Sequence, residues 1–127
     1  MAEGKGCLYG SLAGVATFAG GDLLGLANPE GVDLIITNFI IRTTVVSTGA
    51  ATIDAGVAAA ATTSNDELID GLDVNAALVL ESNHDQVTAG TVAEHEVEWG
   101  PDEFLTITPS AATTGLVGTY YVEYIRV

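Results

Sequence analysis

Residues 91–108 read TVAEHEVEWGPDEFLTIT, and this stretch decides the fold class. Up to Trp99 the residues alternate, with Glu94, Glu96 and Glu98 pointing to one side. The other side carries Ala93, His95, Val97 and Trp99. A period of two with one wet face indicates a β-strand. Gly100-Pro-Asp then forms a turn into a second strand-like run, 103–108, so we expect a hairpin or a corner between two sheets.

Further short runs rich in Val, Ile, Thr, Tyr and Phe lie at 32–47, 51–57 and 118–127, separated by Gly, Pro, Asn and Asp turn signals. Short strands at this spacing predict an all-β, single-domain sandwich. Ser64-Asn-Asp-Glu67 has the form of a helix capping box and ends at Gly71, which predicts one short helix. Residues 1–26 hold seven glycines among apolar residues and predict an arm that packs on a neighbouring subunit. The sandwich domain is then 27–127.

Two of the predicted strands, 32–47 and 118–127, are apolar on both faces. Such a strand either has its outer face covered, which suggests subunit contacts, or contains a bulge that reverses its facing midway. On the first interpretation the interface would involve side chains from the arm and from both strands: Leu8, Leu12, Phe18, Leu24, Ile36, Phe39, Tyr121 and Ile125.

The charge balance excludes several kinds of partner. With 17 Asp and Glu against 3 Lys and Arg, the chain carries a net charge of −14. Such a surface repels phosphate, so we expect no nucleic-acid partner and no anionic membrane surface. No apolar run approaches the length of a spanning helix, and the first residues lack a signal-peptide pattern. The repulsion among so many acids favours a salty compartment, as in a halophile or its virus, or an oligomer or partner that supplies compensation.

No motif indicates catalysis. Asp66, Asp70 and Asp73 offer oxygens to Ca²⁺, but the loop order of a calcium-binding hand is absent. His84 and His95 offer two imidazoles to a transition metal without cysteines to complete a zinc site. Cys7 is the only cysteine, so no internal disulfide forms, and no nucleophile elbow is present. We therefore expect a non-enzymatic protein without a cofactor.

Two stretches carry a family resemblance. Residues 45–59, continuing through 68–77, and residues 115–125 resemble small all-β virion proteins encoded beside the capsid genes of tailed viruses of bacteria and archaea. The resemblance implies a jelly-roll-like sandwich. It also implies a head decoration, cement or turret subunit that binds the major capsid protein on the outside of an HK97-type shell. Such a protein is made in the host cytoplasm and resides on the virion exterior.

Two other functions remain open at this level. A tail or connector protein of the same virion fits the composition equally well, and a carbohydrate-binding or adhesion module shares the sandwich architecture. We expect self-association as well, as a trimer or, at a shell vertex, a pentamer, because capsid axes offer these symmetries and a closed ring hides the second apolar faces.

Overall fold

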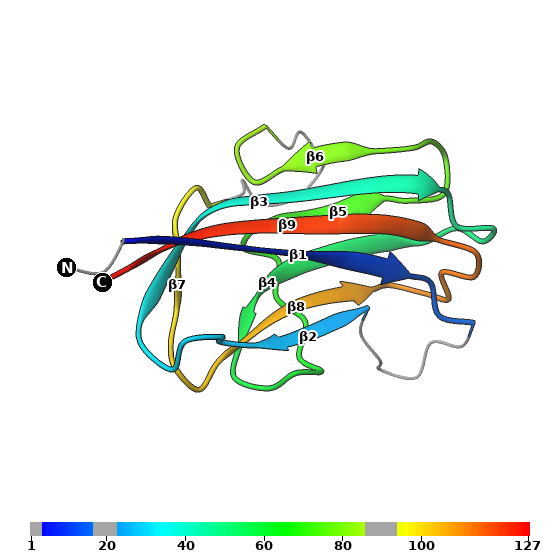
Figure 1. Ribbon diagram of the computed structural model, residues 1–127. Helices are drawn as coiled ribbons and strands as arrows, with labels where there is room; N and C mark the ends of the chain where they lie inside the picture. Colours follow the sequence, from blue (N-terminus) through cyan, green and yellow to red (C-terminus); the bar gives the residue numbers. More distant parts are fainter. Residues whose placement is uncertain (1–3, 17–22, 86–93) are drawn as a thin grey trace.

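The computed structural model describes residues 4–16, 23–85 and 94–127, which form two antiparallel sheets packed face to face (Figure 1). Sheet A has the order β1-β9-β3-β6, with β7 also paired to β3, and sheet B has the order β2-β8-β4-β5. The strands are β1 (Lys5–Ala13), β2 (Leu24–Ala27), β3 (Leu34–Val45), β4 (Thr52–Ala58), β5 (Ile69–Asp73), β6 (Leu80–Ser82), β7 (Val97–Trp99), β8 (Phe104–Pro109) and β9 (Val117–Arg126). The all-β sandwich predicted from the sequence is confirmed.

The strand pairing is nested. β1 pairs with β9, β2 with β8, β3 with β6 and β4 with β5, all antiparallel. A long antiparallel hairpin that rolls up on itself produces this pattern, which is the topology of a jelly roll. One consequence is that β1 and β2 lie at the same side of the sandwich, at the ends of their sheets (Figure 1).

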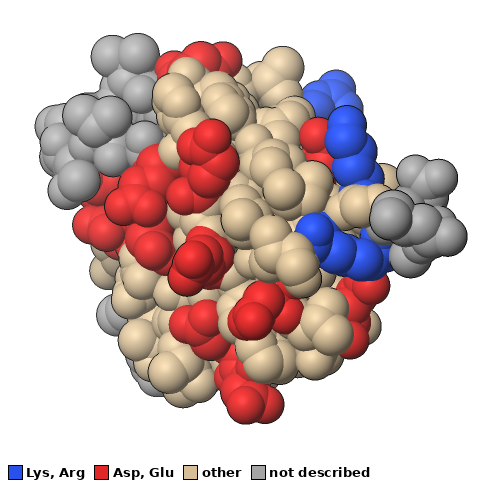
Figure 2. Space-filling model, turned by 90° about the vertical axis from the view of Figure 1, so that its left-hand side faces the viewer, with Lys and Arg blue, Asp and Glu red and all other residues tan. Residues whose placement is uncertain are grey.

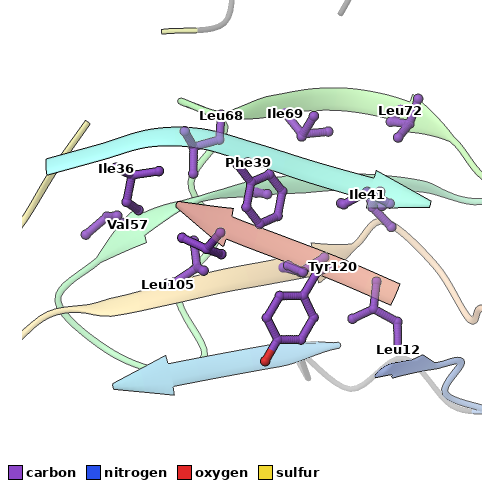
Figure 3. Close-up of a cluster of buried hydrophobic side chains, with 14 of the residues drawn as sticks. Leu12, Ile36, Phe39, Ile41, Val57, Leu68, Ile69, Leu72, Leu105 and Tyr120 are labelled. Carbon is purple, nitrogen blue, oxygen red and sulfur yellow. The ribbon is translucent and has the colours of Figure 1, made fainter. Parts of the chain in front are cut away.

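The core fills the space between the sheets (Figure 3). Its largest fully buried side chains are Trp99 and Phe39, joined by aliphatic residues from both sheets. Of the two arrangements expected at 100–102, a hairpin or a corner, the structure has the corner, because β7 belongs to sheet A and β8 to sheet B. The strand expected over 91–99 is shorter than predicted: residues 94–96 are not in a strand, and residues 91–93 lie outside the described ranges. The indole N–H of Trp99 donates to the Glu103 carbonyl oxygen (3.1 Å) across this corner. None of the described residues forms a helix of the length and apolarity needed to cross a membrane.

A bulge explains why the run 32–47 is apolar on both faces. The register between β3 and β9 shifts between Ile36 and Asn38. Before the shift Leu34 and Ile36 point into the core, and after it Phe39 and Ile41 do. Even-numbered residues of β3 therefore face the core before the bulge, and odd-numbered residues face it afterwards. Much of what looks like a second apolar face in the sequence is the same core-facing side.

The residues expected to form an arm instead supply two strands of the sandwich. β1 pairs with β9 over its whole length, and β2 pairs with β8. The glycines of β1 have a packing role: a Cβ on Gly6 would lie 2.5 Å from the Tyr124 ring, and one on Gly10 would lie 2.8 Å from the Tyr120 ring. Glycine at these positions lets the rings of two tyrosines lie close to the backbone of β1. Because β1 and β2 both belong to the sheets, the described residues show no separate arm.

The short helix predicted from Ser64 to Gly71 is wrong. No helix occurs in the described ranges, and β5 begins at Ile69. Glu67 does not bond back to residue 64, because its Oε1 accepts the backbone N–H of Val57 on β4 (3.0 Å). Ser64 instead shares a 2.6 Å hydrogen bond with the hydroxyl of Thr108. Tertiary contacts to sheet B thus replace the local cap.

Candidate docking surface

The outer face of sheet A carries apolar and tyrosine side chains in cross-strand rows. Tyr9 on β1 lies opposite Tyr121 on β9, which lies opposite Ile40 on β3. A second row joins Ile125 and Ile35. At the far side of the sheet Leu80 on β6 lies opposite Arg42. We call this surface, from β1 to β6, the A face.

The A face has large accessible apolar groups. Tyr9 is 80% exposed and Leu80 is 68% exposed, while Tyr121, Ile40 and Ile125 are half-buried against their neighbours. Tyr9 and Tyr121 occupy directly opposed positions on adjacent strands. A surface that carries tyrosines beside apolar residues has the composition of the central part of a protein–protein interface.

The A face is also nearly neutral. Its outward-facing strand residues include two cations, Lys5 and Arg42, and two acids, Glu98 and Glu123, whose charges cancel. The exposed acids Glu94 and Glu96 lie just before β7. The third cation, Arg126, lies on β9 of the same sheet. Figure 2 shows the Lys and Arg side chains gathered at one side of the molecule, while acids spread over the rest of that view. The net charge of −14 therefore resides mainly away from the A face.

Sheet B presents a different outer side, because the segment 59–67 covers it. Thr106 and Thr108 are buried there, and the Asn65 side-chain amide donates to the Val57 carbonyl oxygen (2.8 Å). Asp54 and Glu67 lie in this layer. Burial raises the pKa of both carboxyls, although each accepts one backbone N–H, and neighbouring acids raise the pKa further. This side of the sandwich is acidic and already covered.

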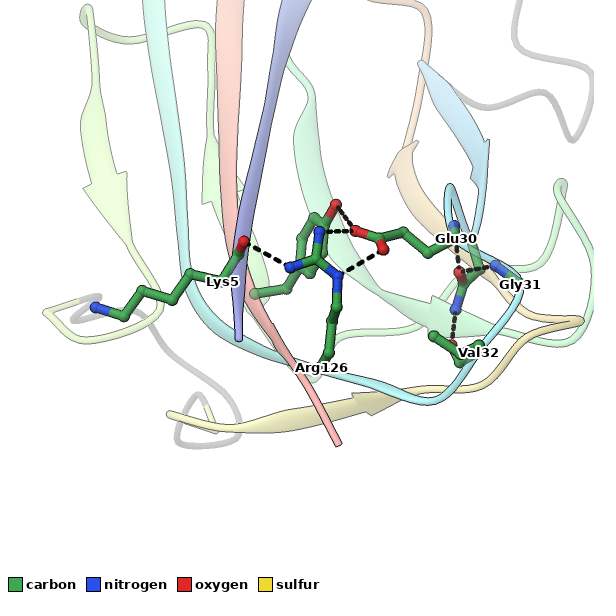
Figure 4. A network of polar contacts seen from close by, with 7 residues as sticks. Lys5, Glu30, Gly31, Val32 and Arg126 are labelled. Atoms are coloured by element: carbon green, nitrogen blue, oxygen red, sulfur yellow. Dashed lines mark hydrogen bonds and ion pairs between the residues drawn. The ribbon is translucent and has the colours of Figure 1, made fainter. Parts of the chain in front are cut away.

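An ion pair holds β1 and β9 in place at one end of the A face (Figure 4). Both oxygens of Glu30, in the β2–β3 loop, accept hydrogen bonds from Arg126, each 2.6 Å long, and Tyr124 donates its hydroxyl to Oε2 (2.7 Å). Arg126 also donates to the carbonyl oxygen of Lys5 (2.8 Å). These hydrogen bonds lower the pKa of the Glu30 carboxyl, with the contribution of Arg126 the largest.

The structure separates those interface residues that it describes, among the ones expected from the sequence, into three groups. Tyr121 and Ile125 lie on the A face. Leu12, Ile36 and Phe39 are buried in the core and cannot contact another molecule while the sandwich is closed. Leu8 and Leu24 pack half-buried at the rim of the core, and Phe18 lies outside the described residues.

Sequence reasoning missed Tyr9, Ile40 and Leu80 as candidates for the A face. The signal for Tyr9 was present in the alternation of β1, where Leu8 and Leu12 point inward. The glycines of that strand concealed this alternation, because they suggested a flexible arm.

The two histidines meet, although they lie eleven residues apart. The ring centroids of His84 and His95 are 4.7 Å apart, and His84 Nε2 lies 2.6 Å from the Thr37 carbonyl oxygen. The described part of the chain contains no group of three or more His, Cys, Asp or Glu side chains placed to hold a metal ion. Asp66, Asp70 and Asp73 are likewise not brought together, and Asp73 instead accepts the backbone N–H groups of Asn75 and Ala76.

A cavity of about 320 Å³ lies where β7 pairs with β3, lined by Asp33, Leu34, Ile35, Glu98, Gly100, Glu103 and Val127. Its lining has carboxylates but no serine, cysteine or histidine side chain, and Glu103 Oε1 accepts the Gly100 N–H (2.7 Å). This arrangement closes the turn at the corner.

Comparison of the chain with protein-family models, with curated proteins and with solved structures finds no match.

Proposed function

We propose that this protein is a non-enzymatic structural subunit of a virion that binds the outside of a capsid through the A face. In this role it serves as a decoration, cement or turret subunit of a tailed virus of a salty medium. The observation that carries the proposal is the contrast between a neutral, tyrosine-bearing A face and a chain of net charge −14.

The shape of the surface supports a protein partner. Small ligands bind in concave pockets, whereas the A face is the open side of a sheet with a protruding Tyr9. Tyr and Arg are among the residues that contribute most at protein interfaces, and Tyr9, Tyr121 and Arg42 occupy adjacent rows here.

The charge distribution supports an acidic partner in particular. Proteins of a salty medium are acidic, so two of them repel each other unless they meet through weakly charged surfaces. The A face provides such a surface, and the acids beside sheet B stay hydrated on the side turned away from the shell. Burying those acids without cations would cost several kcal/mol each.

The topology is consistent with this role but does not decide it. Jelly rolls occur in viral capsid proteins and also in lectins. A second candidate is a carbohydrate-binding module, and the positions of Tyr9 and Tyr121 support it. A sugar ring would stack on these tyrosines, beside the polar side chains of Glu123 and Arg42.

The decisive experiment mixes the purified protein with undecorated shells at ~2 M NaCl and images the particles. We expect density on the capsid exterior for the wild type. The double variant Tyr9→Ser, Tyr121→Ser should bind about 30-fold more weakly or worse, as for the loss of interface hot spots. Leu78→Ala is the matched control, because Leu78 is 60% exposed but lies in the β5–β6 loop.

Other outcomes distinguish the rival functions. Density confined to the tail would assign a tail or connector role. Absence of binding to any part of the virion, together with chemical-shift changes at Tyr9 and Tyr121 on titration with free sugars, would assign the carbohydrate-binding role. Either result would overturn the proposal.

A further inference from the structure

The strand β1 has one paired edge and one open edge. Its nine residues pair with β9 without a register shift, and no strand of the described ranges pairs with its other side. Hydrogen bonds at the two ends of the pairing show which residues of β1 face β9. The Arg126 N–H donates to the Gly4 carbonyl oxygen, and the Gly14 N–H donates to the Leu116 carbonyl oxygen. Even-numbered residues thus bond to β9, and by the alternation of an antiparallel ladder the odd-numbered residues face the open side.

The open edge exposes backbone donors and acceptors. Cys7, Tyr9 and Ser11 have their N–H and C=O groups directed away from β9, and the described part of the chain supplies no partner for them. The carbonyl oxygen of Lys5 accepts a hydrogen bond from Arg126. A row of such groups is a template for another strand.

Proteins normally protect such an edge, and β1 lacks the usual protection. Short strands, prolines, central charges and bulges all prevent pairing with another chain. β1 is nine residues long, contains no proline or register shift, and has a single charge at its first residue, Lys5. By contrast β2, β5, β6 and β7 are only three to five residues long.

We infer that β1 pairs antiparallel with β1 of a second copy of this chain, so that two A sheets join into one continuous sheet across a two-fold axis. Length selects this occupant, because among the sheet edges of the described residues only another β1 can pair over nine residues. Charge favours it too. The residues from Gly6 to Ala13 are uncharged, so two chains of net charge −14 approach each other where their repulsion is weakest.

Full overlap of the two strands fixes the register. Tyr9 lies opposite Tyr9 of the second copy, Cys7 opposite Ser11, and each Lys5 opposite Ala13, at opposite ends of the joint. Odd residues then meet odd residues, as their outward N–H and C=O groups require. The two Tyr9 side chains lie on the same side of the joined sheet, so the A face becomes continuous across the dimer.

This association differs from the trimer expected from the sequence. That expectation assigned the second apolar faces of 32–47 and 118–127 to subunit contacts. The bulge in β3 accounts for much of the second apolar face of 32–47 without a subunit contact. A two-fold, isologous contact between edges is closed by itself and needs no ring. It is independent of whether the A face binds a capsid.

The register is tested with disulfides at the native cysteine. Ser11→Cys in the chain that retains Cys7 places a cysteine opposite Cys7 of the second copy, at the Cα separation of about 5.5 Å that a disulfide tolerates. We expect this variant to form a cross-linked dimer on a non-reducing gel under mild oxidation. The wild type, with Cys7 alone, and the variant Cys7→Ser, Ser11→Cys, with residue 11 alone, are the matched controls. Neither control should cross-link efficiently. In this register residue 7 of one copy is offset by about four residues along the strand from residue 7 of the other, and the same holds for residue 11.

The edge itself is tested with proline. Ser11→Pro removes an N–H that faces the open side and leaves the bonds to β9 intact, so the sandwich should fold. Light scattering at ~2 M NaCl should give twice 13.0 kDa for the wild type and for Ser11→Ala, and 13.0 kDa for Ser11→Pro. Circular dichroism checks that Ser11→Pro is folded. If it is not, Tyr9→Lys replaces it and is compared with the wild type at ~0.15 M NaCl, where the Debye length is about 8 Å. At this 80% exposed residue the variant would place like charges opposite each other.

Three results would overturn the inference. A wild type that stays at 13.0 kDa at all concentrations shows that the edge does not associate. Equal cross-linking of the three cysteine forms indicates random collision without a register. A dimer that survives both Ser11→Pro and Tyr9→Lys uses another surface.

Discussion

The side-chain oxygen of Asn83 accepts a hydrogen bond from the backbone N–H of Phe39, 44 residues earlier, at 2.9 Å. Both residues are buried, with 1% and 0% of their surface exposed. Asn83 also donates from its amide nitrogen to the carbonyl oxygens of Glu94 (2.9 Å) and His95 (3.2 Å). The side chain of Asn83 thus provides the hydrogen-bond acceptor for a backbone N–H of β3 just after its bulge. It also connects residues 94 and 95, which precede β7, to sheet A.

Replacing Asn83 with Ala should destabilise the protein strongly. The Phe39 N–H would remain buried without an acceptor, which costs about 1–3 kcal/mol, and the bonds to 94 and 95 would be lost as well. We expect the free energy of unfolding in urea to fall by about 2–4 kcal/mol. His84→Ala is the control, because it removes an exposed side chain next to the same bulge, and it should cost less than about 1 kcal/mol. Equal effects of the two variants would contradict this role of Asn83.

The Glu30 ion pair should make stability depend on pH in the acid range. Hydrogen bonds from Arg126 and Tyr124 lower the pKa of Glu30 in the folded state. A carboxyl whose pKa is lowered by folding stabilises the fold above its unfolded pKa, and this contribution is lost as the pH falls through the lower, folded value. The melting temperature of Glu30→Gln should therefore lie below that of the wild type at pH 7. The gap should narrow below the ordinary Glu value of 4.5, and a gap independent of pH would refute the assignment.

Asp54 should behave in the opposite sense. Burial raises the pKa of its carboxyl, so the ionised form opposes folding at neutral pH and protonation relieves it. Asp54→Asn keeps an oxygen for the Gly71 N–H, which Asp54 Oδ1 now accepts at 2.7 Å. We expect a gain of about 0.5–1 kcal/mol at pH 7 and low salt, closing as the pH falls toward 3.8.

Asp73→Asn is the control of opposite sign for that experiment. Hydrogen bonds from the N–H groups of Asn75 and Ala76 lower the pKa of Asp73. Neutralising it should reduce the melting temperature at pH 7, with the loss disappearing in acid. Stabilisation by both substitutions would mean that general charge reduction, and not the local environment, determines the effect.

Salt should stabilise the fold. The described residues form one ion pair, Glu30 with Arg126, against a net charge of −14. Screening at ~1 M salt shortens the range of repulsion to about 3 Å, so most of the strain among acids disappears. We expect the melting temperature to rise by about 10 °C or more between ~20 mM and ~2 M NaCl. Identical melting curves at both concentrations would count against a protein adapted to a salty medium.

Local patterns predicted much of the fold, and nonlocal contacts limited the rest. The turn at 100–102 was predicted because its signal is local, although the sequence left open whether it joins a hairpin or two sheets. The alternation before Trp99 predicted a strand that the structure shows only over Val97–Trp99. The pattern of Ser64 and Glu67 predicted a helix that does not form, because their hydrogen-bond partners, Thr108 and Val57, come from other strands. No local rule identifies such a partner in advance.

The candidate surface was predicted only in part for the same reason. Tyr121 and Ile125 were expected at an interface and lie on the A face. Gly6 and Gly10 suggested flexibility, whereas they make room for the rings of Tyr124 and Tyr120, which are contributed by a strand more than a hundred residues later. Without that pairing, the outward position of Tyr9 could not be derived.

The nested strand order has a consequence for the speed and timing of folding. β9 follows every other described strand in the chain, yet it lies inside sheet A between β1 and β3. Pairing of β1 with β9 closes a loop of more than a hundred residues, and folds dominated by such distant contacts form slowly. During synthesis from the N-terminus, β1 emerges first and then waits with both edges open until the ribosome has released β9. Throughout that interval nascent chains on neighbouring ribosomes can join through β1 before either has folded.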